Sequence, residues 1–155
     1  MSTHTPVHER GISLIELLLG LAITALVLAP LVPMLQTASA VARFAGDRVA
    51  LEREADFALE RIATRIRATA PTKEVADKPS SEWLKPAVYS ASNGMLIEQQ
   101  GRETYVVAES VSAFDMTAAA VDSAHPLITV SLSLSLGPGK ASTTAVASVR
   151  MGTAR

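Results

Sequence analysis

The chain has 155 residues, and its 14 basic and 15 acidic side chains leave a net charge of −1. This balance argues against broad electrostatic attraction to nucleic acid, and the length leaves room for one modest domain. The chain contains no cysteine, which excludes a disulfide framework, a thiol nucleophile and a thiolate metal site.

A polar leader, residues 1–11, precedes a long apolar segment. Residues 12–29 contain no proline, and a helix over this stretch would be ~27 Å long, close to the ~30 Å of a bilayer core. Glu16 is the only ionisable residue between Ile12 and Leu35. A carboxylate at mid-bilayer costs about 3 kcal/mol, so such a residue usually has a function and a partner. We predict a transmembrane helix over residues 12–35, with the leader in the cytoplasm.

The run Gly11-Ile12-Ser13-Leu14-Ile15-Glu16 resembles the class III signal of type IV pilins and type II secretion pseudopilins. The resemblance implies cleavage after Gly11 by a prepilin peptidase and methylation of the new terminus at Ile12. It also implies that Glu16 pairs with the terminal amine of a neighbouring subunit. The expected protein is a single-pass protein of the bacterial inner membrane with a periplasmic C-terminal domain. Its expected partners are other pilins in a filament and an inner-membrane assembly platform.

Two other interpretations of the N-terminus remain open. Ala38-Ser39-Ala40 has the A-x-A pattern of an ordinary secretory signal, which would give a small secreted β-rich binding domain starting at Val41. The segment could also be a signal anchor that is never processed and keeps Met1 or Ser2. The length of the apolar run and the position of Glu16 favour the pilin interpretation, because a secretory core is about 7–15 residues long and fully apolar.

Pro30 and Pro33 follow the proline-free stretch. Each proline removes a backbone donor and crowds the preceding turn, so we expect a bend between Leu28 and Leu35. In the resemblance, Pro33 matches the proline at which the N-terminal helix of the family kinks.

An amphipathic helix is predicted to continue over residues 36–70. One apolar stripe recurs at spacings of three and four and should pack on a sheet: Leu51, Ala55, Leu59, Ile62 and Ile66. The opposite face is charged, and we interpret it as a solvated surface: Arg53, Asp56, Glu60, Arg61, Arg65 and Arg67. Residues 56–68 are similar to the end of the first helix in W-group minor pilins and J-group minor pseudopilins. That similarity implies a minor subunit at the tip or in the priming complex.

Residues 71–155 are predicted to form a loop and an antiparallel sheet. Asn93-Gly94 is a strong hairpin signal between strands 87–91 and 95–98. Further strands are expected at 103–108, 111–116, 126–136 and 142–150. In strand 126–136, alternation places Ile128, Val130, Leu132, Leu134 and Leu136 on one face. The expected fold is therefore α+β, with a long N-terminal helix packed on a C-terminal antiparallel sheet.

No catalytic constellation is visible in the sequence, and we expect no enzyme activity, no cofactor and no metal site. His125 stands alone beside a proline, which favours a surface histidine over a general base. Asp115 and Asp122 bracket a short segment and could meet a cation, but calcium prefers several oxygen ligands from one loop. Solvation of a turn is the simpler interpretation of these two aspartates.

Overall fold

The computed structural model describes residues 13–71, 80–119 and 125–153. The predicted leader, the cleavage position Gly11-Ile12 and Asp122 lie outside the described residues. The chain divides into two compact units, Met1–Ala42 and Arg43–Arg155.

The first unit contains α1 (Leu14–Leu28) and the beginning of α2 (Leu31–Ala68). Regular helix is interrupted between them at Ala29 and Pro30, where the Ala29 N–H still donates to the carbonyl of Ala25 at 2.9 Å. Pro33 lies inside the first turn of α2, where a missing backbone N–H leaves no helical bond unmade. The interruption therefore lies at Pro30, and the change of direction expected from the two prolines stays a prediction.

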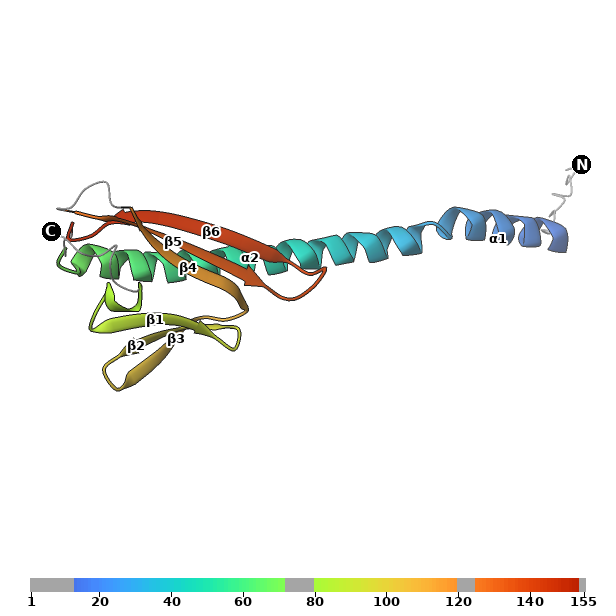
Figure 1. Ribbon diagram of the computed structural model, residues 1–155. Coiled ribbons are helices and arrows are strands. Elements are labelled where there is room, and N and C mark those ends of the chain that lie inside the picture. The colour runs from blue at the N-terminus through green and yellow to red at the C-terminus, as the bar shows by residue number, and fades with distance from the viewer. Residues whose placement is uncertain (1–12, 72–79, 120–124, 154–155) are drawn as a thin grey trace, which may run out of the picture. The chain divides into compact units, whose positions relative to one another are not determined.

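The described residues of the second unit form the rest of α2, a short 3₁₀ helix η2 (Ser80–Glu82) and six strands, labelled in Figure 1. The strands are β1 (Ala87–Ser92), β2 (Met95–Gln100), β3 (Glu103–Ala108), β4 (Val111–Ala119), β5 (Leu127–Ser135) and β6 (Ser142–Arg150). Asn93 and Gly94 both have positive φ, 52° and 73°, as a tight hairpin turn requires. The predicted α+β fold is confirmed.

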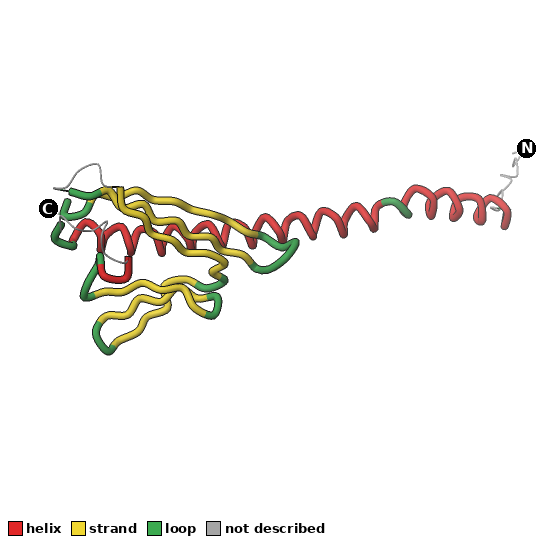
Figure 2. The backbone as a smooth tube through the Cα atoms, in the orientation of Figure 1, coloured by secondary structure: helices red, strands yellow, loops and turns green. Residues whose placement is uncertain are grey.

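The strands form two antiparallel sheets, β1-β2-β3 and β4-β5-β6, where we expected one. After β3 the chain turns through Ser110, which adopts a positive φ of 53°, and β4 then pairs with β5 instead of continuing the first ladder. The Val111 N–H donates to the carbonyl of Gly94 at 2.8 Å, which ties the start of β4 to the β1–β2 turn. Figure 2 shows the two groups of strands separately.

The core of the second unit lies between α2 and the sheets. All five members of the predicted helix stripe are buried, and Ile62 and Ile66 are 0% exposed. On β5, burial alternates as predicted: Ile128, Val130, Leu132 and Leu134 are buried. Leu136 was wrongly placed with them, because β5 ends at Ser135 and Leu136 enters the turn with 38% of its surface exposed. Each fully buried aliphatic side chain stabilises the fold by roughly 1.5–3 kcal/mol.

Candidate functional site

Glu16 lies in the first turn of α1. Ser13 precedes the helix with extended backbone angles (φ −69°, ψ 143°), and its carbonyl accepts from the N–H groups of Glu16 and Leu17 at 3.0 and 3.1 Å. A serine followed three residues later by glutamate is the pattern of a capping box, but the Ser13 side chain makes no capping hydrogen bond. The carboxylate is still placed favourably, because the positive end of the helix dipole lies in this turn.

The surface of α1 around Glu16 is apolar and uncovered. None of the residues of α1 is buried, and Leu14, Ile15 and Leu17 are 77%, 77% and 65% exposed. The helical stretch beginning at Leu14 contains an 18-residue window with a mean hydropathy of 2.4, which is apolar and long enough to cross a membrane. Covering this surface would be favourable, but it would also bury Glu16, and a buried carboxylate needs a partner.

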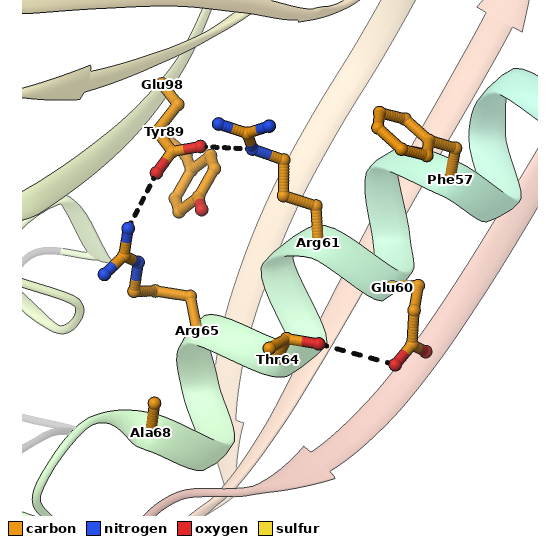
Figure 3. Close-up of a pocket in the computed structure, with 8 residues that line it drawn as sticks. All are labelled: Phe57, Glu60, Arg61, Thr64, Arg65, Ala68, Tyr89 and Glu98. Carbon is orange, nitrogen blue, oxygen red and sulfur yellow. Dashed lines mark hydrogen bonds and ion pairs between the residues drawn. The ribbon is translucent and has the colours of Figure 1, made fainter.

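A second polar arrangement lies between α2 and β2 in the second unit, which is called the head from here on. The sequence analysis did not predict it. Arg61 Nε lies 2.5 Å from Glu98 Oε2, and Arg65 Nη2 lies 3.1 Å from Glu98 Oε1. Glu98 is 1% exposed, while the arginine side chains are 41% and 31% exposed. Figure 3 shows both guanidinium groups reaching the same carboxylate from successive turns of α2. The prediction of a wholly solvated charged face is therefore wrong at Arg61 and Arg65, because β2 brings a buried carboxylate against both side chains while leaving them partly exposed.

The electrostatics of this cluster favour its charged form. Burial by itself would raise the pKa of Glu98, but hydrogen bonds from Arg61 and then Arg65 outweigh burial and lower the pKa. The hydrogen bond to Glu98 in turn raises the pKa of each arginine. Burial is also the largest cause of the raised pKa of Tyr89, whose buried hydroxyl has no hydrogen-bond partner of ordinary geometry among the described residues.

The sequence did contain a signal for this cluster. Glu98 is two residues after Leu96 in β2, and side chains two apart in a strand share a face. Both residues are buried, so Glu98 points inward with an apolar neighbour. Arg61 and Arg65 are four apart, which places them on one side of a helix. The sequence therefore indicated an inward-facing carboxylate and an i,i+4 arginine pair on one side of a helix. It did not indicate that the strand carrying the carboxylate would lie against that helix.

A groove of about 530 Å³ lies beside the cluster. It is lined by Phe57, Glu60, Arg61, Thr64, Arg65, Ala68, Tyr89 and Glu98. Two carboxylates lie in this lining: Glu98 is held by two arginines, and Glu60 is paired with Arg67 at 3.0 Å. We therefore interpret the cluster as a structural link between α2 and the first sheet.

The remaining candidate residues are not brought together. Asp115 lies on β4 opposite Ser131, and its predicted companion Asp122 is outside the described residues. His125 Nδ1 lies 3.0 Å from the carbonyl oxygen of Met151. Across the part of the chain that the structure describes, three or more His, Cys, Asp or Glu side chains do not gather anywhere in a metal-binding arrangement.

Comparison with known families gives one finding. Residues 7–32 match the family described as the prokaryotic N-terminal methylation motif. The matched stretch contains α1, Glu16 and the interruption at Pro30, and it supports a type IV pilin-like protein with a membrane-anchoring N-terminal helix. Neither the comparison with curated proteins nor that with solved structures found a match.

Proposed function

We propose, on the premise of this methylation motif, that the protein is a minor pilin or pseudopilin. It would be a structural subunit of a type II secretion pseudopilus or a type IV pilus, located at the tip or in the priming complex. A prepilin peptidase would cut the precursor after Gly11 and methylate Ile12. The observation that carries the proposal is the uncovered apolar helix α1, whose one carboxylate, Glu16, lies in its first turn.

Glu16 would set the position of the subunit in the filament. The new amine at Ile12 carries a positive charge, and in a bundle of staggered helices it would lie beside Glu16 of a neighbour in apolar surroundings. A low dielectric strengthens this attraction and equally penalises a missing partner. Only the staggered arrangement that pairs the two charges would then be stable.

Before assembly, α1 would hold the precursor in the inner membrane with the C-terminal domain in the periplasm. The hydropathy and the length of the helical stretch that begins at Leu14 support this location. The partners would be other pilins or pseudopilins, the peptidase and methyltransferase, and the assembly platform. Similarity of residues 56–68 to minor subunits supports the tip or priming position.

The head would supply contacts at the filament surface, not catalysis. The Glu98 cluster supports this role, because its two ion pairs hold the first sheet on α2. We assign no enzymatic step to any described residue.

The mature N-terminus tests the proposal directly. The full-length chain is produced in a bacterium that has a working prepilin peptidase, and the membrane form is sequenced from its N-terminus. A terminus at N-methylated Ile12 supports the proposal. A terminus at Val41 would indicate a secreted domain, and one at Met1 or Ser2 an unprocessed anchor. The residues before Val41, Ala38 to Ala40, lie within α2.

A further inference from the structure

We propose that the groove beside the Glu98 cluster binds an acidic segment of a partner protein. The carboxylate of that segment would lie against Arg61 and Arg65, and an apolar side chain next to it would lie against Phe57. The site rests on the proposed function in one respect, since it gives the chemistry of a contact that the head would make with another protein. The groove and its charges belong to the head alone.

The groove follows one side of α2 for three turns. Its helical lining recurs at the spacing of a single helix face: Phe57, Glu60, Arg61, Thr64, Arg65 and Ala68. Tyr89 on β1 and Glu98 on β2 complete the lining. From Phe57 to Ala68 the helix rises by about 16 Å, which is the length of about five residues of extended peptide. A groove of this length suits a peptide segment better than a small organic acid.

The Tyr89 hydroxyl is a buried donor that faces this groove. Tyr89 is 7% exposed, and no described residue forms a hydrogen bond of ordinary geometry with its hydroxyl. A buried tyrosine hydroxyl usually has a partner, because an unmade hydrogen bond costs free energy. Figure 3 shows the hydroxyl turned toward α2, between the side chains of Arg61 and Arg65. Burial raises the pKa of Tyr89, so the hydroxyl keeps its proton at neutral pH and can donate it.

The two arginines offer donors to the same position. Glu98 accepts from both, and Gln100 Oε1 accepts from Arg65 Nη2 at 3.3 Å. A guanidinium has more N–H groups than these contacts use, and the two side chains are 41% and 31% exposed. Donors therefore outnumber acceptors in the groove, so a ligand that fits must supply acceptors. The arginines can turn aside to admit it, because side-chain rotamer changes are common on binding.

The charges of the lining favour a carboxylate over a phosphate. Glu60 is already paired with Arg67 at 3.0 Å. Arg61, Arg65 and Glu98 then leave a net charge of +1. A carboxylate balances this charge and accepts well from arginine. A phosphate monoester carries about −1.5 to −2 at pH 7 and would leave uncompensated negative charge beside the buried Glu98.

Phe57 gives the site an apolar side. Its ring is 63% exposed and lines the same groove as the arginines. Aromatic and arginine side chains are the types most enriched where proteins bind one another. An aliphatic residue next to the acid would cover this ring while the acid meets the arginines. The fitting segment therefore combines one acidic residue with an apolar neighbour.

Peptide titration tests the site. The full-length chain in a neutral detergent is titrated by calorimetry with the peptide acetyl-Ser-Leu-Glu-Leu-Ser-amide. We expect saturable binding, and about ten-fold weaker binding or less when glutamine replaces the glutamate of the peptide. The glutamine peptide is uncharged and enters micelles at least as readily, so it controls for the detergent. Equal binding of the two peptides, or none by either, would overturn the proposal.

Two other ligands distinguish the chemistry of the anion. The first is the same peptide with phosphoserine in place of glutamate, and the second is acetate. We expect both to bind more weakly than the glutamate peptide. Tighter binding of the phosphoserine peptide would show a phosphate site, and equally tight binding of acetate would show a site for small anions. Either result would contradict the proposed acidic segment.

A matched pair of tyrosine variants tests the geometry. Tyr89→Phe removes the unpartnered hydroxyl and should weaken binding of the glutamate peptide about ten-fold. Its melting temperature should not fall, because that hydroxyl makes no bond in the free head. Tyr105→Phe is the control: the Tyr105 ring lies 5.8 Å from Arg61, but its hydroxyl is bonded to Glu103. Equal affinities of the two variants, or a lower melting temperature of Tyr89→Phe, would contradict the assigned role of Tyr89.

Peptide binding and maturation can fail separately. A chain that matures at Ile12 but does not bind the glutamate peptide would refute the groove site and leave the pilin assignment intact. A chain that starts at Val41 would refute the pilin assignment, and the titration would still decide whether the groove binds an acidic segment.

Discussion

Glu98 Oε2 on β2 accepts a hydrogen bond from Arg61 Nε on α2 at 2.5 Å, and this contact links residues 37 positions apart. The carboxylate is almost fully buried, whereas the guanidinium can still reach water. The two partners therefore differ in how much the fold depends on each. The cost of losing one of them depends on which charge is left behind.

Removing both arginines should destabilise the head more than removing the glutamate. In Arg61→Ala/Arg65→Ala, a buried carboxylate is left without a partner, and we expect the free energy of unfolding to fall by about 3–5 kcal/mol. In Glu98→Leu, the arginines can turn to solvent, and we expect a loss of about 1–2 kcal/mol. Denaturant unfolding in detergent measures both, with Arg53→Ala as a surface control expected within about 0.5 kcal/mol. The reverse order would mean that the carboxylate is hydrated.

The same cluster should make stability depend on pH. The pKa of Glu98 is lower in the folded state than in the unfolded chain, where a glutamate titrates near about 4.3. The folded state therefore gains stability above that value, and the gain is lost as pH falls through the lowered folded pKa. Wild type should exceed Glu98→Gln in stability at pH 7, and the difference should shrink below about pH 4. A difference that is constant from pH 7 to pH 3 would contradict the assigned ion pairs.

Leu59 tests the packing of α2 on the sheets. Its side chain is 7% exposed, and Leu59→Ala removes buried surface and leaves a cavity. We expect a loss of about 2–5 kcal/mol, seen as a lower melting temperature. Phe57, two residues earlier, is 63% exposed, so Phe57→Ala serves as a control with a much smaller effect. An unchanged melting temperature in Leu59→Ala would show that the packing assignment is wrong.

Gly11→Val should block maturation. Glycine has no side chain, so the peptide bond before Ile12 can enter a tight protease site that a branched side chain would obstruct. We expect the precursor to accumulate in the membrane, as detected by its mass and N-terminal sequence. Thr5→Val provides a control in the same leader and should mature normally. Normal maturation of Gly11→Val would argue against cleavage at this position.

Glu16→Leu should separate insertion from assembly. The variant removes a costly polar group, so it should insert in the membrane at least as well as wild type. Cleavage after Gly11 should continue, but pairing with the Ile12 amine of a neighbour is lost. Crosslinking to partner pilins, together with a secretion or piliation assay, should show defective assembly. Normal crosslinking and function would mean that Glu16 is incidental and would favour the signal anchor.

Local sequence patterns were sufficient for most elements of the head. The period of two in residues 126–136 predicted β5 and most of its buried face, and Asn93-Gly94 predicted the first hairpin. The spacing of Leu51 to Ile66 predicted which stripe of α2 is buried. These features depend on neighbours a few residues apart, and a sequence reveals such neighbours directly. The N-terminal signal is of the same local kind.

Long-range placement decided the rest. Periodicity identifies a strand but does not say which strands pair, so the separation into two sheets at Ser110 was not foreseen. The same limit explains the error at Arg61 and Arg65. On the helix alone they are two solvated cations, and only the arrival of β2, more than thirty residues later, brings Glu98 to them. The sequence by itself thus determined the helix, the strands and the prepilin-like signal, while the tertiary structure decided which charges are buried, because burial depends on what the rest of the chain brings against them.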